Sequence, residues 1–200
     1  MAMTTVGACE AIQQTRPDAI FVTTMGAMNG MDKLETSSLS VACVPLMGGA
    51  ASLGLGLAIA SPAKNVIVLD GDASLLMELG GLVSVAQAAP TNFVHVVFNN
   101  SIQFSGLGNL DTPGSCVVDL PAMAKAAGYR SAWRFGNLDD LKRRIAEILA
   151  APGPVFVELV VAAEDPKLGT DYPAIEMTDA RFTRMGDELR RIRAAVAHAT

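Results

Sequence analysis

Short apolar runs of strand-like composition alternate with longer helical stretches along most of the chain. Three of these runs are almost wholly apolar: Asn65–Asp70, Asn92–Phe98 and Pro154–Val161. A strand that is apolar on both sides has to be covered on both faces, which occurs in parallel sheets whose connecting helices pack on either side. The sequence therefore predicts an α/β fold, with a mostly parallel sheet and helices on both faces.

A fourth strand is expected at Ala19–Thr23, and helices are expected in the stretches between and around the strands. Apolar residues at helical spacing, or composition and length, predict helices over 5–15, 50–60, 74–88, 119–127, 138–150 and 179–197. No repeat or linker divides the 200 residues, and a chain of this length can bury one sizeable core. We expect a single domain, 1–200.

Composition excludes several classes of partner. A net charge of −5 gives no reason to expect nucleic acid. The uncharged run Leu46–Ala60 carries four glycines and is shorter than the roughly 20 residues of a membrane span, so a buried helix with close backbone contacts is expected instead. Three widely spaced cysteines and the absence of an apparent signal peptide favour a reduced, cytoplasmic protein.

Polar residues with ligand chemistry follow two of the expected strands. Gly71-Asp72-Ala73-Ser74 comes directly after one strand and opens a helix, and Asn99-Asn100 ends the next strand along the chain. The 25 residues between Ala73 and Asn99 are enough for a helix, a loop and a returning strand. A right-handed crossover then brings Asp72 and Asn100 to the same edge of the sheet.

This combination suits a cation and a phosphate group. A carboxylate, an amide oxygen and a backbone carbonyl supply half of the octahedral oxygen shell that Mg²⁺ prefers. The N–H groups of Ala73 and Ser74 at the helix start favour an anion. Each dipeptide alone is an ordinary turn, but together they predict a metal-bridged phosphate or diphosphate.

Two other sites fit the sequence less well. Asp70-Gly71-Asp72 resembles the Asp-x-Asp of haloacid-dehalogenase-type phosphatases, but Asp139-Asp140 open a helix and do not supply the second acidic pair at a strand end. The glycines of 54–60 lie within a helix before a strand, which excludes a nicotinamide fingerprint.

His95 alternates with apolar residues and is expected to be a hydrogen-bonded core histidine.

At these residues the chain resembles the thiamine diphosphate enzymes, whose signature joins Gly-Asp-Gly to a later Asn-Asn across a similar spacing. The stretches LMGGAASLGLG (46–56), VIVLDGDASLLMELGGL (66–82), FVHVVFNN (93–100), MAKAAGY (123–129) and PGPVFVELVVA (152–162) resemble the phosphonopyruvate and sulfopyruvate decarboxylase group. The resemblance implies the diphosphate-binding (PP) domain of that family.

The resemblance also implies roles for single residues. Asp72, Asn100 and the Ile102 carbonyl would ligate Mg²⁺, and Gly71, Ala73 and Ser74 would hold the diphosphate.

Two further roles concern the middle of the cofactor. Met47 would form the apolar wedge that bends the cofactor, Gly48 beside it would also contact the cofactor, and the carbonyl of Pro45 would lie near its 4′-amino group. Relatives use the loop 23–29 to contact phosphate or pyrimidine.

The sequence departs from the family pattern in two single residues and one run. Ala73 replaces the last glycine of the motif, which requires only a negative φ. The run after Asn100 and Thr170 near the C-terminus also differ from the family residues. The last two differences weaken any inference that the substrate is a phosphonate or a sulfonate.

No part of the sequence resembles the pyrimidine-binding (Pyr) domain, which carries the activating glutamate in this family. The resemblance therefore implies the β-type subunit of a heteromeric 2-oxo acid decarboxylase, α2β2 or larger, whose α-type partner supplies the Pyr domain. An acetolactate synthase-like carboligase subunit and a non-catalytic, cofactor-holding subunit are the alternatives.

Overall fold

A computed structural model describes residues 2–34, 39–43, 47–105, 108–165 and 179–197. Its centre is a six-stranded sheet in the order β2-β1-β3-β4-β8-β7, in which every pairing is parallel. The strands are β1 (Ile20–Thr23), β2 (Leu39–Ala42), β3 (Val66–Gly71), β4 (Phe93–Asn99), β7 (Ser131–Phe135) and β8 (Val155–Val160). The short strands β5 (Ile102–Gln103) and β6 (Leu110–Asp111) pair antiparallel beside the sheet.

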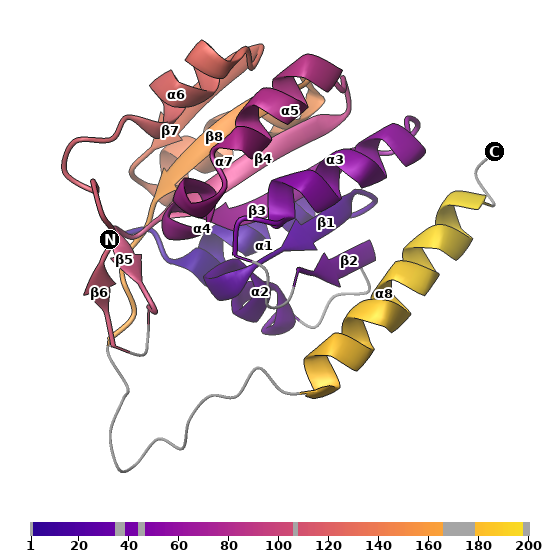
Figure 1. The fold of residues 1–200 in the computed structure, drawn as a ribbon, viewed down its shortest axis with the longest axis horizontal. Helices are drawn as coiled ribbons and strands as arrows, with labels where there is room; N and C mark the ends of the chain where they lie inside the picture. The colour runs from indigo at the N-terminus through magenta and orange to yellow at the C-terminus, as the bar shows by residue number, and fades with distance from the viewer. Residues whose placement is uncertain (1, 35–38, 44–46, 106–107, 166–178, 198–200) are drawn as a thin grey trace.

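Helices cover both faces of the sheet (Figure 1). One face packs against α1 (Thr5–Thr15), α2 (Met25–Asp32) and α7 (Leu138–Ala150). The other face packs against α3 (Ala50–Ala60), α4 (Asp72–Met77), α5 (Gly80–Ala88) and α6 (Leu120–Ala127). The last helix, α8 (Asp179–Ala197), lies along the edge strand β2. The predicted α/β class, with a parallel sheet covered on both faces, is confirmed.

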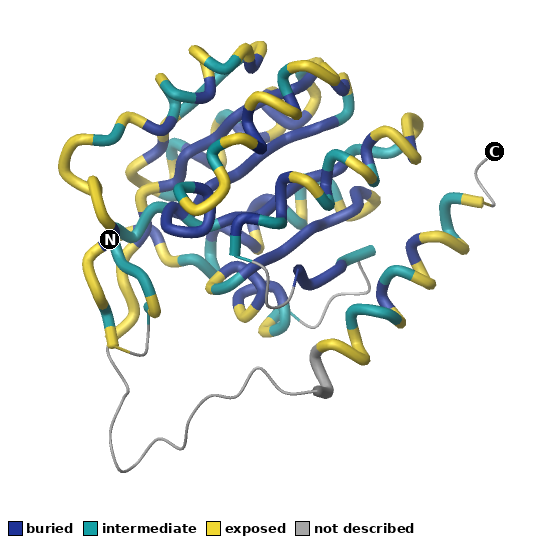
Figure 2. Tube along the Cα trace, in the orientation of Figure 1, coloured by how far each residue is buried: buried dark blue, intermediate teal, exposed yellow. Residues whose placement is uncertain are grey.

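The two faces of the sheet form two separate cores. Alternate strand residues, such as Leu69 and Val96, join the core beneath α1 and α7, and their neighbours, such as Val68 and Val97, join the core beneath α3 and α5. Figure 2 shows the strands buried throughout most of their length and the outer faces of the helices exposed. This double burial explains why the strands are continuous apolar runs in the sequence.

Four helices have the predicted bounds, namely α1, α3, α7 and α8. The prediction of one helix over 74–88 is wrong, because the chain forms α4 and α5 with a break at Glu78 and Leu79. Glu78 leaves the helical conformation with φ −140° and ψ 61°. Gly80 and Gly81 follow directly. Because glycine has a low helix propensity, these two residues do not favour a single continuous helix through this point.

The glycine-rich segment Ala50–Ala60 forms α3 as predicted, whereas Leu46 lies outside the described residues. Gly54 faces the sheet so closely that a Cβ placed there would lie 2.3 Å from Val68 Cγ2. The expected close backbone contact is therefore present. None of the helices in the described part of the chain combines the length and apolarity of a membrane span.

Candidate functional site

The loops after β3 and β4 meet at one edge of the sheet. The two strands are neighbours, and Gly71 at the end of β3 pairs with Phe98 near the end of β4. The predicted crossover geometry is therefore confirmed, and it places the loops that carry Asp72 and Asn100 side by side. This edge is where open parallel sheets bind ligands.

Asp72 is a buried carboxylate with an unused oxygen. It is the first residue of α4 and only 5% exposed, and its Oδ2 atom has no hydrogen-bond partner in the described structure. Burial raises the pKa of Asp72, while the backbone N–H groups of Ala73 and Ser101 and the nearby Thr112 hydroxyl act in the opposite direction. An ionised carboxylate is costly in such a place unless a cation or a donor compensates it.

Asn100 and Ile102 lie in the turn that follows β4. Asn100 Oδ1 accepts the backbone N–H of Ile102 at 3.0 Å, which bends the side chain back over the turn. An amide oxygen has two lone pairs, so Asn100 retains one for a ligand. Ser101 stands between these two residues, and its backbone N–H acts on the Asp72 carboxyl group and lowers the pKa of that group. The turn therefore lies near the start of α4.

Thr112 is a residue of the site that was not predicted from the sequence. It follows β6, and its backbone N–H donates to the Ser101 carbonyl at 2.9 Å. Thr112 is 2% exposed, and its Oγ1 atom, like Asp72 Oδ2, has no partner within hydrogen-bond distance in the described structure, although the hydroxyl lies near enough to lower the pKa of Asp72. The β5–β6 hairpin brings it there, and nothing in its local sequence points to this position.

Ser74 joins the helix start of α4 to the segment that precedes α3. Its buried hydroxyl accepts the backbone N–H of Gly48 at 2.8 Å. Gly48 has φ +88°, and a Cβ there would lie 2.7 Å from Glu78 Cβ, so the position requires glycine. Met47, half-buried beside Gly48, is thereby held next to α4. Pro45 lies outside the described residues.

The ligand atoms of this edge fit Mg²⁺ and a diphosphate. The fit rests on the orphaned carboxylate oxygen of Asp72, whose helix start follows β3, the strand paired with the one that leads into the Asn100–Ile102 turn. Ala73 has a helical backbone with negative φ, so alanine is accommodated in place of glycine. No group of three or more His, Cys, Asp and Glu side chains suited to a metal occurs among the described residues.

Residues 23–29 are only partly a loop. Thr23 ends β1, and α2 begins at Met25, which has φ +49°. The Thr24 N–H donates to the Leu69 carbonyl of β3 at 3.1 Å. This segment therefore lies at the carboxyl ends of β1 and β3, on the same edge of the sheet as Asp72.

His95 is a core histidine with both ring nitrogens satisfied, as predicted. Its Nε2 lies 3.2 Å from Asp70 Oδ2 and its Nδ1 lies 3.2 Å from the Tyr129 hydroxyl. All three residues are at most 2% exposed. Asp70 Oδ1 in turn accepts the N–H of Gly71 at 2.8 Å, which ties the buried histidine to the first residue of the candidate site.

These features define a class of protein: a parallel α/β domain with a polar candidate site at the carboxyl edge of its sheet. Residues 22–159 match the family model described as "Thiamine pyrophosphate enzyme, C-terminal TPP binding domain". The chain therefore belongs to the thiamine pyrophosphate (thiamine diphosphate) enzymes.

Curated relatives include two kinds of decarboxylase. The chain is 40% identical over 162 residues to a phosphonopyruvate decarboxylase of Streptomyces hygroscopicus, covering 80% of this chain and 40% of the relative. It is 40% identical over 131 residues to a sulfopyruvate decarboxylase subunit beta of Methanothermobacter thermautotrophicus, covering 66% of this chain and 64% of the relative. The chain thus spans about two fifths of the first relative and under two thirds of the second.

Solved structures show the same fold at lower identity. A thiamine diphosphate-dependent 4-hydroxybenzoylformate decarboxylase of Rhodococcus jostii superposes with a TM-score of 0.69 at 22% identity, covering 83% of this chain and 34% of that one. The fold and the family resemblance identified from the sequence are both confirmed.

Proposed function

We propose that this chain is the diphosphate- and Mg²⁺-binding part of a thiamine diphosphate-dependent 2-oxo acid decarboxylase. The observation that carries the proposal is the buried carboxylate of Asp72, whose unused oxygen lies at the edge where the Asn100 turn and the start of α4 meet. The similarity to phosphonopyruvate and sulfopyruvate decarboxylases supports this chemistry over that of other phosphate-binding α/β proteins.

In this proposal the cation and the diphosphate are held by residues of the two loops at the sheet edge. Asp72, Asn100 and the carbonyl of Ile102 bind Mg²⁺. The diphosphate is bound by the residues that flank Asp72, namely Gly71, Ala73 and Ser74.

The segment before α3 faces the middle of the cofactor in the same proposal. Met47 and Gly48 contact it there, with Met47 enforcing its bent conformation and the Pro45 carbonyl near its amino group. When bound, the cofactor supplies the carbon nucleophile and accepts the electrons left behind by CO₂. The chain's own residues anchor and orient it.

The Pyr domain with its activating glutamate is supplied by a separate α-type subunit, in an assembly of α2β2 or larger. Similarity to three proteins named as sulfopyruvate decarboxylase subunit beta supports a split enzyme. The three cysteines are reduced thiols, two of them buried, which fits the reducing cytoplasm in which we place the complex.

Carboligation is the second candidate reaction. A probable acetolactate synthase of Oryza sativa subsp. japonica is 29% identical over 146 residues. The higher identity to decarboxylases favours simple decarboxylation. A non-catalytic, cofactor-holding role is a further alternative, which the presence of both Asp72 and Asn100 disfavours.

The first experiment is a tagged pull-down from the native source, with mass spectrometry of the proteins that co-purify. We expect a Pyr-type partner, and the purified complex should then bind thiamine diphosphate in a Mg²⁺-dependent manner. Release of CO₂ from pyruvate, phosphonopyruvate and sulfopyruvate is measured alongside acyloin formation. Isolation of this chain without a partner contradicts the split enzyme, and acyloin as the main product favours the carboligase.

A further inference from the structure

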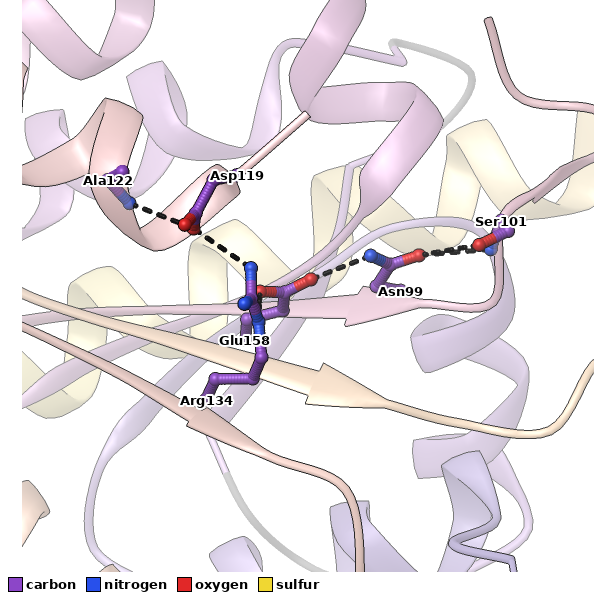
Figure 3. A network of polar contacts seen from close by, with 6 residues as sticks. All are labelled: Asn99, Ser101, Asp119, Ala122, Arg134 and Glu158. Carbon is purple, nitrogen blue, oxygen red and sulfur yellow. Dashed lines mark hydrogen bonds and ion pairs between the residues drawn. The ribbon is translucent and has the colours of Figure 1, made fainter. Parts of the chain in front are cut away.

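A chain of polar contacts runs from the edge of the sheet to the turn after β4 (Figure 3). Arg134 of β7 donates through Nε to Glu158 Oε2 at 2.5 Å, and Glu158 Oε1 of β8 accepts from Asn99 Nδ2 at 2.6 Å. Asn99 Oδ1 then accepts from the backbone N–H of Ser101 at 3.0 Å and from its hydroxyl at 3.3 Å. The contacts thus connect three neighbouring strands to the residue between Asn100 and Ile102.

Glu158 is a buried charge in the middle of an apolar strand. Its side chain is 2% exposed, whereas that of Arg134 is 47% exposed. Arg134 is also held by Asp119 at 2.9 Å, so the guanidinium has one carboxylate on either side. A buried carboxylate without such a partner is strongly destabilising, and the ion pair with Arg134 offsets this cost. The ion pair does not explain why Glu158 also contacts Asn99.

The contact with Glu158 determines which way the Asn99 amide points. An ionised carboxylate can only accept hydrogen bonds, so the Asn99 NH₂ group has to face Glu158. The amide oxygen is then turned toward Ser101, where it meets two donors. A neutral residue able to donate at position 158 would remove this constraint.

The hydrogen bonds to Asn99 Oδ1 stabilise Ser101, whose backbone is strained. It has φ +60°, in the left-handed region that residues other than glycine, asparagine and aspartate rarely occupy. Such a conformation persists only where surrounding contacts hold it. The strained residue separates Asn100 from Ile102, so its conformation determines how the amide oxygen of one and the carbonyl of the other are presented.

We propose that Glu158 is a positioning residue for the cation-binding turn, acting through the orientation of the Asn99 amide on the left-handed backbone of Ser101. This inference rests on the proposed function, because it concerns the residues assigned there to Mg²⁺. Glu158 does not contact the cation itself. In the sequence, Glu158 is the single charged residue of the apolar run PVFVELVV.

The test compares Glu158→Gln with Glu147→Gln in the complex of this chain with its partner. Glu147 forms an exposed ion pair with Arg144 on α7, so it controls for the loss of one carboxylate charge. The readout is the Mg²⁺ concentration that gives half-maximal binding of thiamine diphosphate, measured by calorimetry without substrate. We expect an increase of about 10–100-fold for Glu158→Gln, the usual cost of losing a residue that orients a metal ligand, and no change for Glu147→Gln.

Two further variants separate positioning from a general loss of stability. Asn99→Asp removes the donor to Glu158 and should raise the Mg²⁺ requirement in the same direction. Ser101→Gly relieves the left-handed strain, so the effect of Glu158→Gln should shrink several-fold in the Ser101→Gly background. A role in stability alone predicts the same fold-change in both backgrounds.

The outcomes distinguish this inference from the proposed function. If the wild-type complex does not bind thiamine diphosphate with Mg²⁺, the proposed function fails and this inference fails with it. If the wild type binds and both Glu158→Gln and Asn99→Asp bind with an unchanged Mg²⁺ requirement, only the positioning role of Glu158 is overturned. An equal effect of Glu158→Gln in the presence and in the absence of Ser101→Gly also overturns it.

Discussion

Asp72 combines burial with an unused oxygen, and this combination makes it the sharpest single-residue test of the site. Asp72→Ala should abolish Mg²⁺-dependent retention of thiamine diphosphate, because it removes the one anionic ligand of the proposed set. Retention after gel filtration is measured by absorbance of the bound cofactor, with Asp187→Ala as the control. Asp187 is exposed and pairs with Arg190 on α8, remote in sequence from the site. Normal retention by Asp72→Ala contradicts the metal assignment.

Met47 should affect the rate more than the affinity. Met47→Ala removes the wedge without touching the proposed ligands of the diphosphate, so we expect kcat to fall by about 10–100-fold, in line with the cost of misplacing reacting groups. The dissociation constant of the cofactor should change far less. Met47→Leu keeps the bulk and serves as the control. An unchanged rate for Met47→Ala would make this residue an ordinary packing methionine.

At the residue scale, the sequence predicted that the loops carrying Asp72 and Asn100 lie at the same edge of the sheet. It did not predict the contacts that hold these loops in place. The spacing between the two motifs was sufficient, because consecutive parallel strands joined by a helix are usually neighbours. The contact between Asn99 and Glu158 depends on β8 lying between β4 and β7, an order that local patterns do not carry. Thr112 reaches Asp72 only through the β5–β6 hairpin, which was not predicted.

At the element scale, periodic apolar residues located the long helices, and weaker patterns failed. α2 has the sequence MGAMNGMD, whose glycines and asparagine favour a loop, and tertiary packing overrides that preference. β7 (SAWRF) is an edge strand with mostly half-buried residues, so it lacks the apolar run of a central strand. The sequence therefore did not predict this strand, which contains Trp133 and Arg134.

α3 offers a matched test of helix packing. Gly54→Ala should lower the free energy of unfolding by about 1–3 kcal/mol, because the new methyl group would overlap Val68 at 2.3 Å. Gly56→Ala, on the same helix, has nothing within 4 Å and should raise it by about 0.5–1 kcal/mol through helix propensity. Urea unfolding of the two variants measures both effects. Equal effects would mean that α3 does not press on the sheet at Gly54.

At the scale of the whole molecule, buried thiols should make stability depend on alkaline pH. Burial raises the pKa of Cys9 to about 12, and burial together with the Asp70 charge raises the pKa of Cys43 to about 11. The folded state therefore keeps both thiols protonated at a pH where the unfolded chain ionises them, above about 8.5. Their contribution to stability is complete below that pH and is lost as pH rises through the folded pKa values.

The measurement is urea unfolding of the wild type and of Cys43→Ala at about pH 8 and about pH 10, on either side of the onset of thiol ionisation in the unfolded chain. We expect the loss of free energy of unfolding between the two pH values to be smaller in Cys43→Ala by about 1–2 kcal/mol. Cys116→Ala is the control, because Cys116 is exposed and should leave the loss unchanged. The same pH dependence in all three proteins would contradict the burial of Cys43 in solution.

One face of the sheet carries buried polar side chains, and the other face is packed by apolar residues. This difference determines which core residues can be substituted without affecting the site. Asp70, His95 and Glu158 alternate along their strands with residues of the α1 and α7 core, so all three project to the opposite face. Substitutions beneath α1 and α7 therefore act on packing, on the face of the sheet opposite to these polar side chains. That face is the place to repack the chain for higher thermal tolerance while leaving its chemistry intact.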